Sequence, residues 1–220
     1  MGAMIEFARP DGGKTKGYLA KAEKAKGNLI VVQEWWGLND QICGIADRYA
    51  RAGYNALAPD LYKGRVTAVP DEATHLMTGL DFADATHQDL RGAAQYLRKF
   101  GGKVVVTGYC MGGALTIAAL VHVPECDVGV CLYGIPPAAF ADPAKIKKPF
   151  QGHFANQDDW CTPAAVDALE KAMKGAGQTP EIHRYDAKHA FTNEQSVDAY
   201  HTASANKAWE RTMAFLKANL

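Results

Sequence analysis

The sequence lacks an excess of charge of either sign. Its 24 lysines and arginines balance 24 aspartates and glutamates, so the formal net charge at pH 7 is zero. A surface that binds nucleic acid, or a polybasic segment that binds a membrane, usually leaves an excess of basic residues. The composition therefore gives no reason to expect a nucleic-acid partner or an electrostatic attachment to a membrane.

Long apolar runs are missing as well. The most apolar part of the chain, residues 104–123, is interrupted by Gly108, Gly112, Gly113 and His122. A helix that crosses a bilayer needs about 20 consecutive apolar residues. Residues 1–20 are polar and glycine-rich, without the apolar stretch of a signal peptide. We therefore expect no membrane span and a cytoplasmic location.

The cysteines lack the spacing of a disulfide or zinc framework. There are five, unevenly distributed, and none forms a Cys-x-x-Cys pair. An odd number without a secretion signal is typical of free thiols in a reducing compartment. The ordinary interpretation of such a cysteine is a small buried apolar side chain. A catalytic role for any one of them needs a separate argument.

What the chain does contain is an alternation of short apolar runs with longer amphipathic ones. The apolar runs that we expect to be strands are residues 27–33, 54–58, 103–108, 128–132, 150–154 and 181–185. The expected helices are residues 40–53, 84–100, 113–122, 163–175 and 200–218. Apolar strands joined by helices indicate an α/β fold, with a mainly parallel sheet covered by helices on both faces. No linker divides the 220 residues, which predicts a single domain over 1–220.

Residues 108–113, GYCMGG, join an expected strand to an expected helix. Gly-x-Cys-x-Gly in this place is the nucleophile elbow of the α/β-hydrolase fold, with cysteine instead of serine. Glycine stands two residues to either side of Cys110 because the neighbouring backbone approaches too closely for a Cβ. The helix N-terminus should favour the thiolate, and the N–H of Met111 should bind the oxygen of a reacting carbonyl. The alternative is a glycine-rich turn with an inert cysteine.

In this fold the acid and the histidine of a catalytic triad follow the nucleophile in that order. Asp158 and Asp159 come after the expected strand 150–154, and His189 precedes the last expected helix. His189 would take the thiol proton of Cys110, and one aspartate would orient the histidine. The other aspartate is expected to be a turn residue.

Five segments together resemble one known family. They are residues 31–39 (VVQEWWGLN), 58–62 (APDLY), 108–113 (GYCMGG), 153–158 (HFANQD) and 189–191 (HAF). In this order they are similar to motifs of the dienelactone hydrolase, or carboxymethylenebutenolidase, family. The segments span most of the chain, so the resemblance does not depend on the elbow alone.

The resemblance implies a role for each matching residue. Cys110, Asp158 and His189 would form the catalytic triad. Glu34 would be the family's additional acid, which contacts the resting cysteine and takes part in its conversion to the thiolate when substrate binds. The backbone N–H of Trp35 would be the second oxyanion donor, beside that of Met111.

The aspartate has two possible positions. The family's aspartate usually lies four residues before a proline, and counting back from Pro163 gives Asp159. Counting forward from His153 and Phe154 gives Asp158, which we prefer.

The family's substrate-binding arginines have no clear match. One of them follows the His-x-Phe motif by two residues, and Asn193 occupies that position here. Six aromatic residues near expected strand ends predict a mouth suited to a flatter or less anionic substrate than dienelactone: Trp35, Trp36, Tyr62, Tyr133, Trp160 and Phe191. From this set we expect substrate contacts by Trp36, Tyr62, Tyr133 and Phe191, and we expect a further contact by Asn193.

The sequence therefore predicts a hydrolase of enol lactones or activated esters that works through an acyl-cysteine intermediate. No metal or organic cofactor is implied, and the expected partner is a small lactone or ester. A carboxylesterase of broader or different specificity is one alternative, and a non-catalytic binding protein of the same fold is another. We expect a monomer or a weak homodimer.

Overall fold

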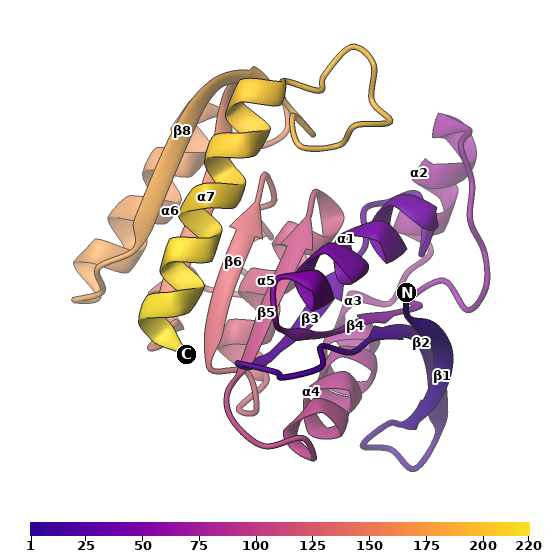
Figure 1. Cartoon of the computed structure of the whole chain (residues 1–220). Coiled ribbons are helices and arrows are strands. Elements are labelled where there is room, and N and C mark those ends of the chain that lie inside the picture. The colour runs from indigo at the N-terminus through magenta and orange to yellow at the C-terminus, as the bar shows by residue number, and fades with distance from the viewer.

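A single eight-stranded sheet forms the centre of the computed structural model, which describes residues 1–220 (Figure 1). The strand order is β1-β2-β4-β3-β5-β6-β7-β8. All pairs from β4 to β8 are parallel, whereas β1 and β2 are antiparallel to their neighbours. The strands are β1 (Ala3–Ala8), β2 (Lys14–Ala20), β3 (Asn28–Val32), β4 (Asn55–Pro59), β5 (Val104–Tyr109), β6 (Val128–Leu132), β7 (Phe150–Gln157) and β8 (Glu181–Lys188).

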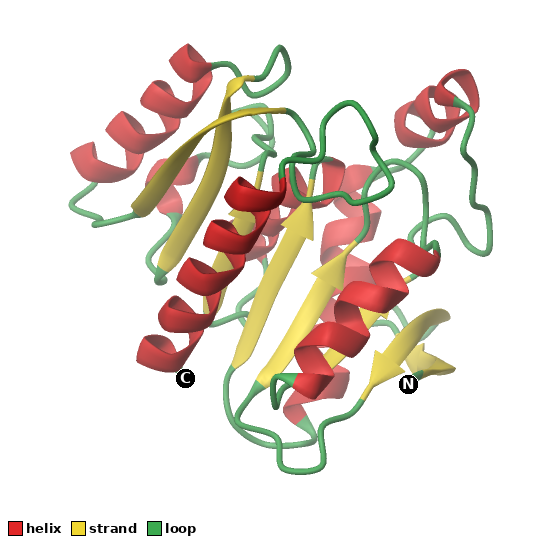
Figure 2. Cartoon of the chain, turned by 45° about the horizontal axis from the view of Figure 1, so that its top comes forward, coloured by secondary structure: helices red, strands yellow, loops and turns green.

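Helices cover both faces of the sheet (Figures 1 and 2). The helices are α1 (Asp40–Arg51), α2 (Pro70–Thr78), α3 (Phe82–Asp84), α4 (Arg91–Arg98), α5 (Met111–His122), α6 (Pro163–Gly175) and α7 (Thr202–Asn219). A π-helical turn, Ala85–Leu90, joins α3 to α4, and a short 3-10 helix covers Pro143–Lys145. None of these helices combines the length and the apolar character that crossing a bilayer requires.

The core lies in two layers because successive strand residues point to opposite faces of the sheet. In β3, Leu29 and Val31 pack with apolar residues of α1 and α7. Ile30 and Val32 pack on the other face, with residues of α2, α4, α5 and α6. Every residue of β3 is buried, as expected for a central parallel strand. The predicted α/β-hydrolase fold is confirmed.

The structure adds elements that the sequence pattern did not predict. Residues 1–20 form the antiparallel hairpin of β1 and β2 at one edge of the sheet, where polar residues alternate with buried ones. Helix α2 also lay outside the prediction, and it buries only Ala73 and Leu76. The expected helix 84–100 is interrupted by the π-helical turn, and β7 and β8 continue three residues beyond their predicted ends.

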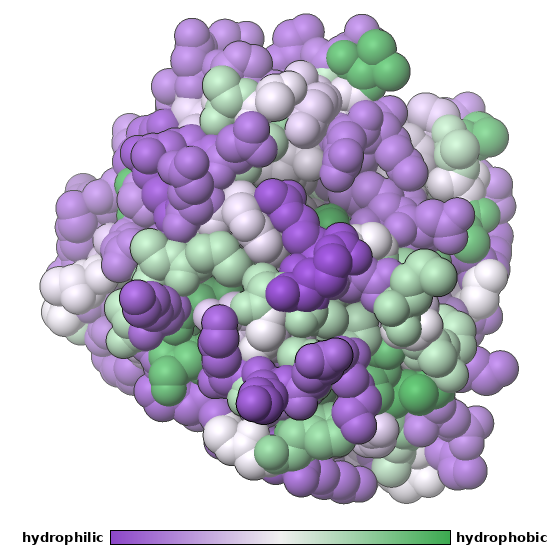
Figure 3. Space-filling model, in the orientation of Figure 1, coloured by the Kyte–Doolittle hydropathy of each residue, from purple (hydrophilic) through white to green (hydrophobic).

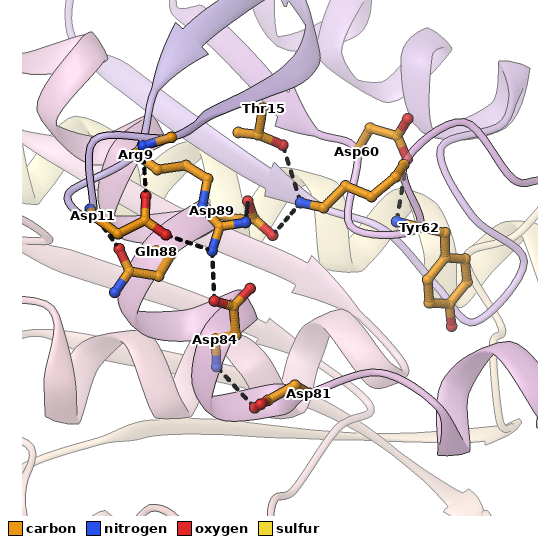
Figure 4. A network of polar contacts seen from close by, with 11 residues as sticks. Arg9, Asp11, Thr15, Asp60, Tyr62, Asp81, Asp84, Gln88 and Asp89 are labelled. Carbon is orange, nitrogen blue, oxygen red and sulfur yellow. Dashed lines mark hydrogen bonds and ion pairs between the residues drawn. The ribbon is translucent and has the colours of Figure 1, made fainter.

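A network of ion pairs holds the β1–β2 hairpin to the rest of the molecule (Figure 4). Arg9, just after β1, pairs with Asp84 of α3 and lies 3.5 Å from the carboxylate of Asp89 in the π-helical turn. Lys63, in the loop after β4, contacts Asp89 at 2.6 Å and Thr15 of β2 at 3.2 Å. Three segments that are distant in sequence therefore meet at the buried carboxylate of Asp89.

Candidate active site

The turn between β5 and α5 presents Cys110 in a backbone conformation that few side chains adopt. Its φ is 54° and its ψ is −116°. A Cβ on Gly108 would lie 2.1 Å from the carbonyl oxygen of Gly112. One on Gly112 would lie 2.4 Å from the carbonyl oxygen of Val32. The predicted steric reason for both glycines is confirmed, because the backbone leaves no room for a side chain at either position.

A third glycine that the motif did not identify is equally constrained. A Cβ on Gly134, after β6, would lie 2.2 Å from the carbonyl oxygen of Cys110. The turn is therefore enclosed by backbone from β3, β5 and the segment after β6.

The ends of β7 and β8 bring the predicted acid and base together. Nδ1 of His189 lies 2.7 Å from Oδ2 of Asp158. The other oxygen of Asp158 accepts hydrogen bonds from the N–H groups of Trp160 at 2.8 Å and Cys161 at 2.9 Å. Asp158 is buried, whereas Asp159 is exposed. The geometry thus favours Asp158 over Asp159 as the partner of the histidine.

The charges of this pair stabilise each other. Burial raises the pKa of Asp158, but the hydrogen bonds and charge of His189 and the two N–H donors outweigh it, so the net pKa is lower than usual. Burial lowers the pKa of His189, yet Asp158 and Cys110 together raise it to about 10. Nε2 of His189 is buried without a hydrogen-bond partner. That nitrogen is the one available to the thiol.

The resting thiol of Cys110 differs from the sequence-based expectation. The helix N-terminus predicted a stabilised thiolate, but the pKa of Cys110 is raised. Burial is the largest cause, and the carboxylate of Glu34 adds to it. His189 and the N–H of Met111 act in the opposite direction without cancelling these effects. The expected effect of the helix N-terminus is present in the N–H of Met111, but burial of the sulfur outweighs it.

Glu34 is a buried carboxylate at the end of β3. It accepts a hydrogen bond from Nδ2 of Asn193 at 2.7 Å and one from the hydroxyl of Tyr133 at 3.2 Å. Burial raises the pKa of Glu34, while these two donors and the charge of His189 lower it. Asn193, at the position of the family's arginine, therefore supplies a neutral partner to the acid beside the thiol.

Two backbone N–H groups are available for a developing oxyanion. That of Met111, the first residue of α5, interacts with the sulfur of Cys110 and lowers its pKa. That of Trp35 donates to no acceptor within the chain. Both residues line the same cavity, as the predicted pair of donors requires.

The cavity above Cys110 has a volume of about 1030 Å³. It is lined by most of the residues that the sequence placed there: Glu34, Trp35, Trp36, Cys110, Met111, Tyr133, Trp160, His189 and Asn193. Apolar residues that the sequence did not single out complete the lining, among them Met77, Phe82, Ile135 and Phe140. Ile135 follows β6 and could have been found from its place at a strand end. Met77 and Phe82 belong to helices whose approach to the site has no local signal.

Two of the expected mouth residues do not line the cavity. Tyr62 is buried, and its hydroxyl lies 3.3 Å from Sδ of Met111, beneath the lining. Phe191 is fully buried, with its ring against Tyr133 and Tyr185. Their placement as direct substrate contacts is corrected: both lie behind residues that line the cavity.

The site contains no arrangement of three or more His, Cys, Asp or Glu side chains that could hold a metal ion. Its reactive groups are a thiol, an imidazole, two carboxylates and backbone N–H donors. This set suits acyl transfer by a nucleophile.

Comparison with known proteins decides the family. The model of the dienelactone hydrolase family matches residues 15–220. This chain belongs to the dienelactone hydrolase family. As a member it is a hydrolase that acts on carboxylic ester bonds.

Relatives of this dienelactone hydrolase family member match over its full length. A protein of Aquifex pyrophilus called protein usf is 33% identical, with 100% of both chains covered. A candidate carboxymethylenebutenolidase of Aquifex aeolicus is 31% identical, again with 100% of both chains covered. The crystal structure of a candidate dienelactone hydrolase from Klebsiella pneumoniae has a TM-score of 0.86, with 27% identity and 99% coverage of each chain.

Proposed function

We propose that this enzyme hydrolyses enol lactones or activated esters with Cys110 as nucleophile, His189 as base and Asp158 as the orienting acid. The observation that supports this most directly is the alignment at the cavity floor. The thiol lies beside the unpartnered Nε2 of His189, whose Nδ1 is bonded to Asp158 at 2.7 Å. Such a nucleophile, base and acid can form and break an acyl intermediate.

The first half-reaction acylates the sulfur. His189 takes the proton of the Cys110 thiol and becomes an imidazolium. The resulting thiolate attacks the acyl carbon, and the N–H groups of Trp35 and Met111 stabilise the oxyanion. The bond from carbon to the leaving oxygen then breaks, and the leaving group takes a proton from the imidazolium of His189. With a lactone, the released oxygen remains attached to the acyl group.

The second half-reaction hydrolyses the acyl-cysteine and regenerates the free enzyme. His189 takes a proton from water, the hydroxide attacks the acyl carbon, and the carbon–sulfur bond breaks to leave the acid and the thiolate. Moving an acyl group from oxygen to sulfur is favourable only when the oxygen is a good leaving group. Enol lactones and aryl esters are therefore better substrates for this arrangement than alkyl esters or amides.

The test is turnover of p-nitrophenyl acetate and of an enol lactone by Cys110→Ala. We expect the variant to lose at least ~10³-fold in kcat, which is the scale of triad deletions. Cys43→Ala is the matched control, because Cys43 is a half-buried free cysteine of α1 outside the cavity lining. Acid-quenched wild-type enzyme should carry the acyl mass on the peptide that contains Cys110. Normal turnover by Cys110→Ala would falsify the proposal.

The assignment of the acid has its own comparison. Asp158→Asn should lose most activity, because the amide cannot hold His189 in the required tautomer and charge state. Asp159→Asn, with an exposed side chain, should stay within about twofold of the wild type. The reverse pattern would transfer the role to Asp159.

A carboxylesterase of broader specificity is the second candidate function. The observation in its favour is that no lysine or arginine lines the cavity, so nothing there selects a carboxylate-bearing lactone.

The five cysteines are all unpaired, which agrees with the expected cytoplasmic location. The predicted monomer or weak homodimer is measurable by light scattering.

A further inference from the structure

The lining of the cavity is nearly free of cationic groups. Of its 24 residues none is lysine or arginine, and the imidazole of His189 is already paired with Asp158. The one carboxylate in the lining, Glu34, is buried and bonded to neutral donors. A substrate carboxylate that entered would lose its water without gaining an ion pair.

Aromatic rings occupy the space where a charged group would otherwise be recognised. The ring centroids of Trp35 and Trp36 are 4.8 Å apart, and those of Trp35 and Trp160 are 6.0 Å apart. The ring of Trp160 also lies 6.3 Å from His189. Phe82 and Phe140 form a second aromatic pair in the lining, 6.4 Å between centroids. Flat faces at these spacings suit the binding of a planar apolar group.

One edge of the cavity carries an exposed aromatic side chain. Seven large apolar residues of the molecule are exposed, and one of them, Trp160, lines the cavity. Trp160 is 65% exposed. Figure 3 shows hydrophobic patches on a largely hydrophilic surface. A large aromatic side chain that stays exposed while it lines a cavity is well placed to contact a bound ligand.

We propose that the enzyme takes neutral esters or enol lactones whose acyl part carries a planar aromatic group, and that it discriminates against acyl groups with a carboxylate. The inference rests on the proposed function and names its substrate class. The tryptophans Trp35, Trp36 and Trp160 bind the aromatic group, while the lack of an unpaired cation in the lining disfavours anions.

A series of esters with one leaving group tests this choice. The p-nitrophenyl esters of 3-phenylpropanoate, butanoate and succinate present an aromatic, a neutral aliphatic and an anionic acyl group to the same reaction. We expect kcat/KM to fall in that order, with at least a tenfold gap between the first and the last, because the carboxylate must be desolvated without a partner. A succinate ester that reacts as fast as the aromatic ester would overturn the proposal.

Two pairs of variants locate the effect. Gln195 lines the cavity and is exposed; its backbone N–H donates to Oδ1 of Asn193, and its side-chain amide makes no hydrogen bond. Gln195→Arg should raise kcat/KM for the succinate ester about tenfold by supplying a cation, and Gln195→Met should leave the anionic-to-neutral ratio unchanged. Trp160→Ala should lower kcat/KM for the aromatic ester about three- to tenfold relative to butanoate, and Trp160→Phe should restore most of it.

The outcomes separate the substrate class from the chemistry. If Cys110→Ala keeps full turnover on all three esters, the proposed function fails. If Cys110→Ala is inactive but the order of substrates is reversed, or if Trp160→Ala changes all esters equally, the thiol chemistry stands and the substrate class is wrong.

Discussion

Cys110 is held at φ 54°, a conformation that typically costs a non-glycine residue about 1–3 kcal/mol. The cost is met by the backbone that surrounds the turn, which packs so closely that a Cβ on Gly108 would lie 2.1 Å from a carbonyl oxygen. The same close packing buries the sulfur. Strain and burial therefore come together, and the residue that projects into the cavity is also the one whose pKa is raised.

Glu34 offers a direct test of this resting state. Its carboxylate raises the pKa of the Cys110 thiol, so Glu34→Gln should lower that pKa and increase the fraction of thiolate at pH 8. Iodoacetamide should then alkylate Cys110 several-fold faster than in the wild type. The amide keeps the shape of the side chain and its contact with Asn193, so a folding defect is not expected. An unchanged alkylation rate would mean that Glu34 carries no charge beside the resting thiol.

Residues whose role follows from local sequence were the ones that could be predicted. The elbow glycines, Cys110 and His189 each lie at a strand end that the apolar pattern marks. The raised pKa of Cys110 could not be predicted, because it depends first on the burial of the sulfur and also on Glu34, which is 76 positions away in the chain. Tyr62 and Phe191 were wrongly placed at the mouth, because proximity to a strand end does not determine which way a ring points.

At the scale of elements, two helical glycines differ in their surroundings. A Cβ on Gly44 of α1 would meet no atom within 4 Å, whereas one on Gly92 of α4 would lie 2.6 Å from the carbonyl oxygen of Ala8. Gly92 thus allows α4 to approach the end of β1, and Gly44 has no such neighbour.

Alanine at these positions should have opposite effects. Gly44→Ala should stabilise the protein by about 0.5–1 kcal/mol, because alanine loses less conformational entropy in a helix. Gly92→Ala should destabilise it by about 1–3 kcal/mol, because α4 must move away from β1. Urea unfolding at equal protein concentration measures both. If both variants were stabilised, the contact between α4 and the hairpin would not be as close as described.

Elements with strong local signals were predicted closely. Helix α6 begins and ends at the predicted residues, with Thr162 as N-cap and Pro163 at its first position. The β1–β2 hairpin was missed because Lys14, Lys16 and Gly17 give β2 a polar pattern, which is typical of strands near a sheet edge. The π-helical turn was missed because its one extra residue per turn leaves no mark in the apolar periodicity.

At the scale of the whole molecule, the ion pairs around Asp89 join the hairpin to the parallel sheet. Asp89→Ala removes the buried acceptor of Lys63 and the carboxylate near Arg9. We expect a loss of about 2 kcal/mol in the free energy of unfolding, because hydrogen bonds to buried charged groups are worth about that much. Lys174→Met, which breaks an exposed ion pair with Glu170, is the control and should change stability by less than about 0.5 kcal/mol. Equal effects in urea unfolding would show that the network adds no more than a surface pair.

Part of the cavity wall comes from segments other than those that hold the triad. Cys110, Asp158 and His189 are fixed by the ends of β5, β7 and β8, whereas Met77, Phe82 and Phe140 belong to α2, α3 and the segment after β6. Substitutions in the walls can therefore alter which substrates enter while the reacting atoms stay in place. In evolution, a protein of this design can change its substrate through a few surface and loop mutations and keep its chemistry.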